Sequence, residues 1–534
     1  MNTQSKSDDN HYDVILIGSG IGGLTTASIL AQVAGKRVLV LESHFKLGGF
    51  LHSFRRKNYV WDPGVHYIGE MQEGSLTRRC MDLVTRGKVD WHAMNSDFER
   101  ISFPNETFCI PSDPDEFQER LIQRFPGERD SIKKYFRDLQ SATSWLQRWF
   151  FSKQFSAPWS GWISAGKRLA LTNTRQYLDG RFDDPLLQAI VAGQWPDFGS
   201  PPDESAFGIH AAVASDFLHG GYYPIGGSQE IVESAASAIE DNGGSCLVSH
   251  PVKEILVRDN RAYGVRVERK GKSESYFAPK IISNAGARTT FSQLVPKEWA
   301  AKERVQLAKV VNGTSAVVLF LGIKDDPRDH GFDDCNYWMY KRTDHRYSQH
   351  EPGQLAPVEG AFLSFGSLRN PGQTPHTAQI VSFSQESEWA QFADTKWKKR
   401  GDEYEALKAA KTEQLLDFVE SRAPGLRAII DYAELSTPLS FRDFTGHHQG
   451  AIYGQACDPN RLSEHQWSIG TSVKNLFLTG TDVGVPGVNS GLMVGVMTAG
   501  KLMGWGGMPR IFSSLGKYKS AEVKRSPSNT ELAE

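Results

Sequence analysis

The sequence predicts an α/β fold that begins with a strand-helix-strand unit. Residues 12–17, YDVILI, end in four consecutive apolar residues, which is typical of a buried parallel strand. The glycine-rich turn GSGIGG follows this run and leads into an apolar helical stretch at about 21–33. A second apolar run, RVLVLE, ends on an acidic residue. Strand, glycine turn, helix and acidic strand end, in this order, predict a Rossmann-like dinucleotide-binding domain.

The glycines of the turn are the first candidate cofactor residues. Gly18, Gly20, Gly22 and Gly23 would let the backbone approach a pyrophosphate at the start of the helix. The unpaired N–H groups and the helix dipole favour negative charge at that position. Glu42 lies nineteen residues after Gly23, at the end of the second strand, and would accept the hydroxyls of the adenosine ribose.

The later parts of the chain alternate in character. Residues 215–300 predict a helix, a hairpin that turns at Asp259-Asn260, and a further strand in KIISNAG. Residues 85–215 are rich in Trp, Phe and Arg and predict mostly helix. Strand-like SAVVLFLGI and TAQIVSFS and a helical DEYEALKAAKTEQLLDFVES lie within 301–435, and the strand NLFLTG with a Gly/Met-rich helix follows near the C-terminus.

Composition excludes several classes of partner. The 534 residues carry a formal charge of -2, so no global field attracts nucleic acid. The five cysteines are far apart and never in a C-x-x-C arrangement, and His447-His448 has no partner at metal spacing, so we expect neither a disulfide framework nor a metal site. The N-terminus is followed by no apolar signal segment, and no apolar run reaches membrane-spanning length, so we expect a cytoplasmic protein.

One aromatic and basic stretch has two interpretations. Between Trp145 and Arg168 the sequence places Trp, Phe, Lys and Arg beside apolar residues. This composition suits a peripheral patch at a membrane interface. It equally suits a pair of helices that lines the cavity for a lipophilic substrate.

Further motifs resemble those of FAD-binding proteins. Gly48-Gly49 in SHFKLGG resembles the second glycine pair of the glutathione reductase class. The segment NLFLTGTDVGVPGVNSGLMVGVMTAG resembles the second flavin-contact region of such proteins. The resemblance implies bound FAD, with Gly480 and Asp482 at its ribityl-pyrophosphate part. It also places the helix that starts at Val488 and Asn489 at the pyrimidine edge of the flavin, where a helix start stabilises negative charge.

A narrower resemblance comes from the order of several segments. YPIGGSQEIVESAASAIEDNGG, VKEILVRDNRAYGVRV and IISNAG occur in the order found in phytoene desaturases, carotenoid isomerases and retinol saturases. WDPGVHYIG looks like a segment of the retinol saturase-like branch, and ELSTPLSF with GAIYG resembles paired elements late in these enzymes. In this family a backbone group at the start of the central hairpin contacts the adenine, which here would be Val252.

The resemblance implies FAD-dependent chemistry at C=C bonds of a hydrophobic polyene or isoprenoid of the carotenoid or retinoid type. Saturation, desaturation and cis-trans isomerisation all remain open. The flavin would carry out the hard step while the protein positions substrate and handles protons. Candidate proton donors or charge stabilisers are His66, Tyr67 and Tyr453. Electrons would come from a transient NAD(P)H donor or from a redox protein, because no second dinucleotide motif is present.

These expectations give a discontinuous organisation. Residues 11–80, 215–300 and 436–512 would form the FAD-binding domain, 81–214 and 301–435 an α+β substrate domain, and 513–534 a disordered tail. Two alternatives use the same start and end motifs. One is a flavin amine oxidase-like enzyme, and the other is a non-catalytic escort-type protein that binds a prenyl chain or lipid.

Overall fold

A parallel sheet of five strands forms the centre of one half of the molecule. The computed structural model describes residues 10–155, 164–347, 351, 353–518 and 523–525. The strand order is β19-β13-β1-β2-β9, and every neighbouring pair is parallel. The strands are β1 (Val14–Ile17), β2 (Val38–Leu41), β9 (Ser245–Leu247), β13 (Ile281–Ser283) and β19 (Leu476–Leu478). Segments from the beginning, middle and end of the chain therefore share one sheet.

Helices from the two ends of the chain pack on this sheet. Helix α1 contacts both α9 and α15, and its buried side chains are Ile, Leu, Ala, Ser and Thr. A Cβ built on Gly495 would lie 2.6 Å from the Cβ of Thr25, so the absence of a side chain brings α1 and α15 into close contact. The helices of this layer are α1 (Ile21–Ala34), α2 (Leu76–Thr85), α9 (Gln229–Glu240), α15 (Val488–Leu502) and α16 (Gly507–Ser514).

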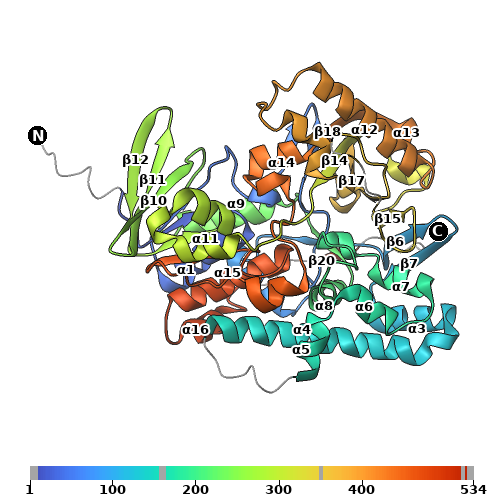
Figure 1. Cartoon of the computed structure of the whole chain (residues 1–534), viewed down its shortest axis with the longest axis horizontal. Coiled ribbons are helices and arrows are strands. Elements are labelled where there is room, and N and C mark those ends of the chain that lie inside the picture. Colours follow the sequence, from blue (N-terminus) through green and yellow to red (C-terminus); the bar gives the residue numbers. More distant parts are fainter. Residues whose placement is uncertain (1–9, 156–163, 348–350, 352, 519–522, 526–534) are drawn as a thin grey trace, which may run out of the picture.

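An antiparallel meander projects from the same half of the molecule (Figure 1). The predicted hairpin turn is confirmed, because Asp259 and Asn260 both have positive φ and join two paired strands. A third strand, which the sequence did not predict, completes the meander. The elements here are β10 (Val252–Arg258), β11 (Arg261–Arg269), β12 (Lys272–Phe277), α10 (Ala287–Thr289) and α11 (Ala301–Leu307).

The second half is built on a mixed sheet of seven strands in the order β18-β14-β17-β16-β15-β6-β7. Residues 85–215 are mostly helix, as predicted, but they also contain strands β6 and β7, which the sequence did not predict. These two strands form a hairpin around the two-residue turn Pro104-Asn105, and β6 pairs in parallel with β15, more than two hundred residues away. Local periodicity contains no signal for that pairing. The strands are β6 (Asp97–Phe103), β7 (Glu106–Pro111), β14 (Ala316–Ile323), β15 (Asn336–Tyr340), β16 (Gly360–Ser364), β17 (His376–Phe383) and β18 (Ile430–Ser436).

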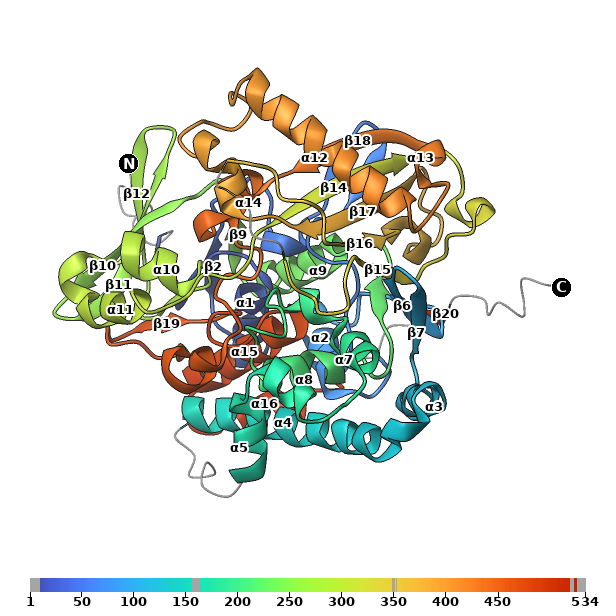
Figure 2. The ribbon, with the colours of Figure 1, turned by 45° about the vertical axis from the view of Figure 1, so that its right-hand side comes forward.

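Helices cover this half on opposite sides, as both views show (Figures 1 and 2). The long α4 runs along one border of the molecule and contacts α3, α5 and α8, whereas α12 lies at the far border and contacts β16. The helices are α3 (Pro114–Arg124), α4 (Arg129–Phe155), α5 (Ser164–Leu171), α6 (Thr174–Asp179), α7 (Pro185–Ala192), α8 (Phe207–Asp216), α12 (Asp402–Glu420), α13 (Leu426–Ile429) and α14 (Pro438–Thr445).

A three-stranded sheet corrects the prediction of a disordered tail from residue 513 onward. Strand β20 (Val523–Arg525) pairs in parallel with β5 (Trp91–Ala93), which pairs in turn with β8 (Tyr222–Pro224). The polar composition of the tail favoured disorder, but β5 offers an otherwise unpaired edge to which a short strand can add. Residues 519–522 and 526–534 of the predicted tail lie outside the described part of the chain.

Packing at the predicted domain edges also differs from the expected boundaries. The hairpin of β3 (Phe54–Arg56) and β4 (Tyr59–Trp61) lies within 11–80, but Tyr59 and Trp61 pack with Val318 and Phe320 of the seven-stranded sheet. Strand β5 and helix α2, by contrast, extend the first half beyond residue 80. No helix of the described residues is both long enough and apolar enough to cross a bilayer.

Candidate active site

One cavity of about 470 Å³ connects the two halves of the molecule. It begins at the carboxyl ends of the parallel strands, where α/β folds bind their ligands, and reaches the face of the seven-stranded sheet. We call its two parts the glycine end and the aromatic end. The glycine end is lined by residues 18–22, 42–44, 480–482 and 486–489, and the aromatic end by Asp197, Trp338, Tyr340, Tyr347, Phe362, Val381, Phe383 and Tyr453.

The glycine end is formed by main chain at the start of α1. Gly18 has a φ of +87°, which a residue with a side chain adopts only under strain. A Cβ on Gly22 would lie 2.7 Å from the Cα of Gly480, so the turn and the C-terminal loop approach at van der Waals contact. The N-cap Gly20 has no side chain to accept hydrogen bonds from the first N–H groups of α1.

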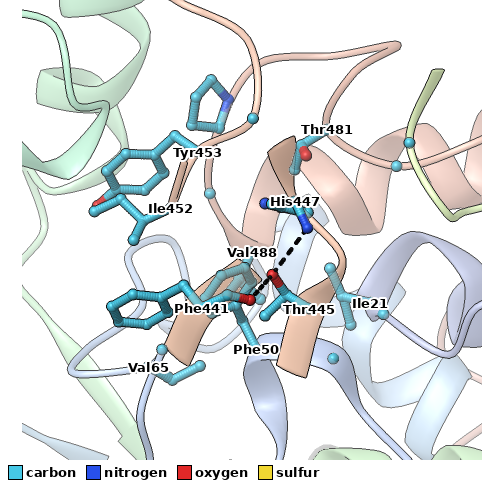
Figure 3. A pocket seen from close by; sticks show the side chains of 18 of the residues that line it. Ile21, Phe50, Val65, Phe441, Thr445, His447, Ile452, Tyr453, Thr481 and Val488 are labelled. Atoms are coloured by element: carbon cyan, nitrogen blue, oxygen red, sulfur yellow. Dashed lines mark hydrogen bonds between the residues drawn. The ribbon is translucent and has the colours of Figure 1, made fainter. Parts of the chain in front are cut away.

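A second helix start faces the same space. Helix α15 begins after Gly487, which likewise provides no side-chain cap. Ile21 of α1 and Val488 of α15 both line the cavity (Figure 3). Two uncapped helix starts supply N–H donors and positive dipole ends, so these residues fit a ligand with a pyrophosphate and a ring that becomes negative on reduction.

Glu42 organises the turn between the two strands. Its Oε2 accepts hydrogen bonds from the Ser19 N–H at 2.9 Å and the Ser19 hydroxyl at 2.6 Å. Its Oε1 accepts from the N–H of His44 at 2.8 Å and the hydroxyl of Ser43 at 3.2 Å. These four donors occupy the lone pairs of the carboxylate, and two of them are hydroxyls that can rotate away. Glu42 lies on the cavity wall, so a ribose hydroxyl can replace a serine hydroxyl there.

Three of the residues expected to bind cofactor do not line the cavity. Gly23 lies behind the turn, where a Cβ would meet the carbonyl oxygen of Gly18 at 2.5 Å, so it allows helix and strand to pack closely. Gly48 packs against Val232 with a φ of +120°, whereas its neighbour Gly49 does reach the wall. Val252 stands in β10, paired with Val267, and its predicted backbone contact with adenine stays a prediction.

The C-terminal residues of the predicted set all reach the wall. The Oδ2 of Asp482 accepts a hydrogen bond from the N–H of Ala287 at 2.7 Å, which ties the loop after β19 to the loop after β13. The Nδ2 of Asn489 donates to the carbonyl of Gly69 at 3.0 Å and to Asp216 at 3.4 Å. The Oδ1 of Asn489 is buried without a partner among the described residues, so it is available to a ligand donor.

His66 lies on the wall between the two ends. Burial, and to a lesser extent the charge of Arg369, lowers its pKa to about 3, so the imidazole is neutral at physiological pH. Its ring packs edge-on against Phe362 at 5.0 Å, and its Nδ1 has no partner among the described residues. A neutral imidazole is a poor proton donor. The interpretation of His66 as an acid is therefore weakened, although it can still orient a polar group.

The two tyrosines expected to act in catalysis also line the cavity. The Tyr67 hydroxyl donates to the Oδ2 of Asp197 at 2.6 Å, and its ring stacks on Phe217 at 4.2 Å. Tyr453 lies beside Ile452 above the apolar side chains Phe441 and Val65 (Figure 3). Burial raises the pKa of both hydroxyls well above the usual value, so both are neutral donors at physiological pH.

Two acidic residues of this site were not predicted from the sequence. Asp197 lines the cavity, and Glu99 lies behind it with a fully buried side chain. The Oε2 of Glu99 accepts a hydrogen bond from Gln194 at 2.7 Å. In β6, Glu99 alternates with the buried Ile101 and Phe103, so an acid on an apolar strand face was the available signal. Asp197 is the last residue of the short 3-10 turn Trp195–Asp197 and gave no comparable signal.

The aromatic stretch that was left with two interpretations lies apart from the cavity. Trp145 is buried in the C-terminal half of α4, which packs on α5 and α8. No described residue between 145 and 171 lines the cavity, so this part does not form the expected substrate wall. Residues 156–163 of the stretch lie outside the described part of the chain.

The fold and the two helix starts are those of a dinucleotide-dependent oxidoreductase. A comparison with protein families identifies the family and the cofactor. The profile of flavin-containing amine oxidoreductases matches residues 21–469, which is most of the chain. The protein therefore belongs to this family and is an FAD-dependent oxidoreductase.

Two relatives indicate the branch of the family, and one solved structure shares the fold. The chain is 30% identical to the all-trans-retinol 13,14-reductase of Danio rerio, with 92% of this chain and 86% of the relative covered. It is 27% identical to the prolycopene isomerase of Arabidopsis thaliana, with 85% and 76% covered. Cyclohexylamine oxidase from Brevibacterium oxydans superimposes with a TM-score of 0.57 at 16% identity, over 92% and 99% of the chains, and this likeness shows the fold alone. The resemblance to the retinol saturase and carotenoid isomerase branches is confirmed.

Proposed function

We propose that this protein reduces a carbon-carbon double bond of a retinoid-type polyene with FAD as its cofactor. The observation that carries the proposal is the continuous cavity, which joins the two uncapped helix starts to an aromatic, largely buried end. An elongated apolar substrate fits such a space, because burial of its surface contributes about 25 cal/mol per Å². The similarity to an all-trans-retinol 13,14-reductase over 92% of the chain supports reduction as the direction.

The residues of the cavity would divide the work. When bound, FAD supplies the two electrons of the reaction. Gly18, Gly20, Gly22 and the start of α15 would hold its charged and polar groups by main-chain donors. Phe362 and Phe383 would hold the polyene against the seven-stranded sheet and exclude water.

The test is conversion of a polyene by the purified, FAD-loaded enzyme under anaerobic conditions with a chemical reductant. All-trans-retinol and a cis-carotenoid are supplied separately, and the products are measured by chromatography and mass spectrometry. Retinol that gains two hydrogens is the expected product. A carotenoid that changes geometry at unchanged mass would instead support isomerisation, the second candidate, which the similarity to a prolycopene isomerase favours.

Amine oxidation remains a distinct alternative because of the family to which the chain belongs. Asp197 and Asp216 line the cavity and could pair with an ammonium group if they were ionised. Burial, however, raises the pKa of Asp197 well above its usual value and that of Asp216 to about 7, which disfavours this pairing. Release of hydrogen peroxide from primary amines, without polyene conversion, would overturn the proposal.

Several finer features complete the proposal. The domain fold is of the glutathione reductase class, supported by the parallel sheet with its antiparallel meander. Electrons reach the flavin from NAD(P)H or from a redox protein that binds transiently.

The protein works in the cytoplasm, which its five free cysteines support, and it contacts a membrane peripherally to obtain its lipophilic substrate. Flotation with liposomes of neutral and anionic lipids tests the membrane contact.

A further inference from the structure

We propose that Asp197 is the proton donor to the substrate double bond, with Tyr67 as its hydrogen-bond partner and Glu99 as a positioning residue behind them. The inference rests on the proposed polyene chemistry and assigns the proton that this chemistry requires. Three segments supply the group: the loop after β4, strand β6 and the turn after α7.

The carboxyl of Asp197 lines the cavity, whereas the carboxyl of Glu99 does not. Asp197 lies on the cavity wall, and its Oδ2 accepts from the Tyr67 hydroxyl at 2.6 Å. Glu99 is 0% exposed and does not line the cavity. Tyr67, Trp338 and Asn336 lie close to the Glu99 carboxyl, yet its Oε1 has no well-aligned hydrogen bond among the described residues, so the stabilisation of an ionised Glu99 is incomplete. Any proton that reaches the substrate from this group must therefore pass through Asp197 or Tyr67.

The electrostatics favour a proton on Asp197. Burial, followed by the nearby Glu99 carboxyl, raises the pKa of Asp197 well above its usual value, and the Tyr67 hydrogen bond opposes this only in part. Burial raises the pKa of Glu99 to about 7. Hydrogen bonding from the side chains around its carboxyl lowers the pKa and offsets only part of this rise; these side chains are Tyr67, Trp338, Gln194 and Asn336. Two carboxyls in one buried site do not both ionise readily, so the pair retains a proton at neutral pH.

No charged group near Asp197 among the described residues would favour its ionised form by forming an ion pair with it. Tyr340 and Tyr453 face Asp197 from β15 and from the loop after α14, and both hydroxyls are neutral because burial raises their pKa values. Arg369 is buried near Tyr67 but directs its guanidinium to the carbonyls of His66, Asp334 and Cys335, the Ser364 hydroxyl and the Asn336 side chain. No ion pair between this arginine and Asp197 or Glu99 occurs among the described contacts.

The proton step balances as follows. The π electron pair of the double bond forms a C–H bond to the proton of the Asp197 carboxyl, so the π bond and the O–H bond both break. The electron pair of that O–H bond stays on the carboxylate, which the Tyr67 hydroxyl then stabilises by donating its hydrogen bond. The other carbon takes a second hydrogen with two electrons from the reduced flavin. Water that enters the cavity after product release returns the proton to Asp197.

The experiment combines three substitutions with a matched control in the FAD-loaded enzyme. Asp197→Asn should lower turnover about a hundredfold or more, because general acid catalysis contributes that amount, while flavin content stays unchanged. Tyr67→Phe should lower turnover less, because the ring that stacks on Phe217 is kept. The control is Asp138→Asn, another buried aspartate that accepts from a tyrosine hydroxyl, at 2.9 Å from Tyr177, but lies away from the cavity.

The pH profile of Glu99→Gln distinguishes an electrostatic role of Glu99 from a purely structural one, because a structural role would leave that profile unchanged. Removing the second carboxyl lowers the pKa of Asp197, so the fall of activity at high pH should begin about one pH unit earlier than in the unsubstituted enzyme. A pH profile of Glu99→Gln that superimposes on that of the unsubstituted enzyme would contradict the positioning role. Unchanged turnover in Asp197→Asn would overturn the assignment altogether.

An infrared titration separates failure of this inference from failure of the proposed function. The carbonyl band of a protonated carboxyl should be present at neutral pH in the unsubstituted holoenzyme and reduced in Asp197→Asn, with no polyene added. Absence of that difference would overturn the inference even if retinol is reduced. Presence of the band in an enzyme that converts no polyene would leave the protonated acid in place and refute the proposed function instead.

Discussion

At the glycine end the cavity wall is built around glycines at helix starts and turns, whereas at the aromatic end it is built from large side chains. The first is made by helix starts and turns with no Cβ in the way, as at Gly22 and Gly480. The second is made by tyrosines, phenylalanines and a carboxyl from separate segments. Added atoms should therefore damage the glycine end, and removed atoms should damage the aromatic end. Each of the following predictions tests one side of this contrast.

The largest effect is expected at the glycine end, from Gly22→Val. A side chain there would meet the backbone of Gly480 at 2.7 Å, where neither partner is a flexible side-chain tip. Bound flavin should fall at least about tenfold, which corresponds to only about 1.4 kcal/mol of binding free energy. The ratio of flavin to protein absorbance measures it. Gly127→Val, at an exposed glycine with nothing within 4 Å of a built Cβ, should keep full flavin content.

The next effect concerns Arg369, which holds the His66 segment of the cavity wall against the seven-stranded sheet. Its fully buried guanidinium donates to the His66 carbonyl at 2.6 Å and to the Asp334 carbonyl at 2.9 Å. Arg369→Met should lower the free energy of unfolding by about 3 kcal/mol, because several buried acceptors lose their donor. Denaturant unfolding measures the loss. Arg346→Met removes an exposed arginine and should change stability by less than about 0.5 kcal/mol; equal losses in both variants would refute the role given to Arg369.

His66 lies between the ends and gives a smaller, pH-dependent effect. Its pKa is lowered to about 3 in the folded protein, while the unfolded chain binds a proton near the ordinary value of 6.5. Folding stability should therefore fall as pH falls from 6.5 toward 3, by at most about 1.4 kcal/mol per pH unit. His66→Phe, which keeps a ring against Phe362, should show a weaker fall, measured by denaturant unfolding at several pH values. Parallel pH curves would show that His66 does not titrate in this way.

The smallest effect is expected for Tyr453→Phe at the aromatic end. The ring fills the space beside Gly199, where a built Cβ would lie 2.5 Å from it, and only the hydroxyl is removed. If Asp197 supplies the proton, kcat should change by less than about tenfold, below the usual contribution of a general acid. Steady-state kinetics with the polyene would check this. A loss as large as that of Asp197→Asn would make Tyr453 the donor and would revise the contrast at that end.

The same contrast explains what could be predicted from the sequence. Gly18, Gly20 and Glu42 belong to one local unit of strand, turn and helix, so spacing alone brought them together. Glu99 and Gln194 are 95 residues apart and meet only because β6 joins a sheet that has most of its strands after residue 310. Parallel pairing over such distances depends on tertiary packing, which periodicity does not contain.

The shared five-stranded sheet also sets an order of events during synthesis. The α1 helix start is made early, but the Gly480 loop and α15 that complete the glycine end are made near the end of the chain. Chains fold from the N-terminus as they emerge, so α1 waits through most of translation for its partner helix. If FAD uses both helix starts, as proposed, both are in place only after β19, the last strand of the five-stranded sheet along the chain, has joined that sheet. Loading of the cofactor would thereby be a late event, and a chain that stops before residue 476 would leave the face of α1 that packs on α15 exposed to chaperones.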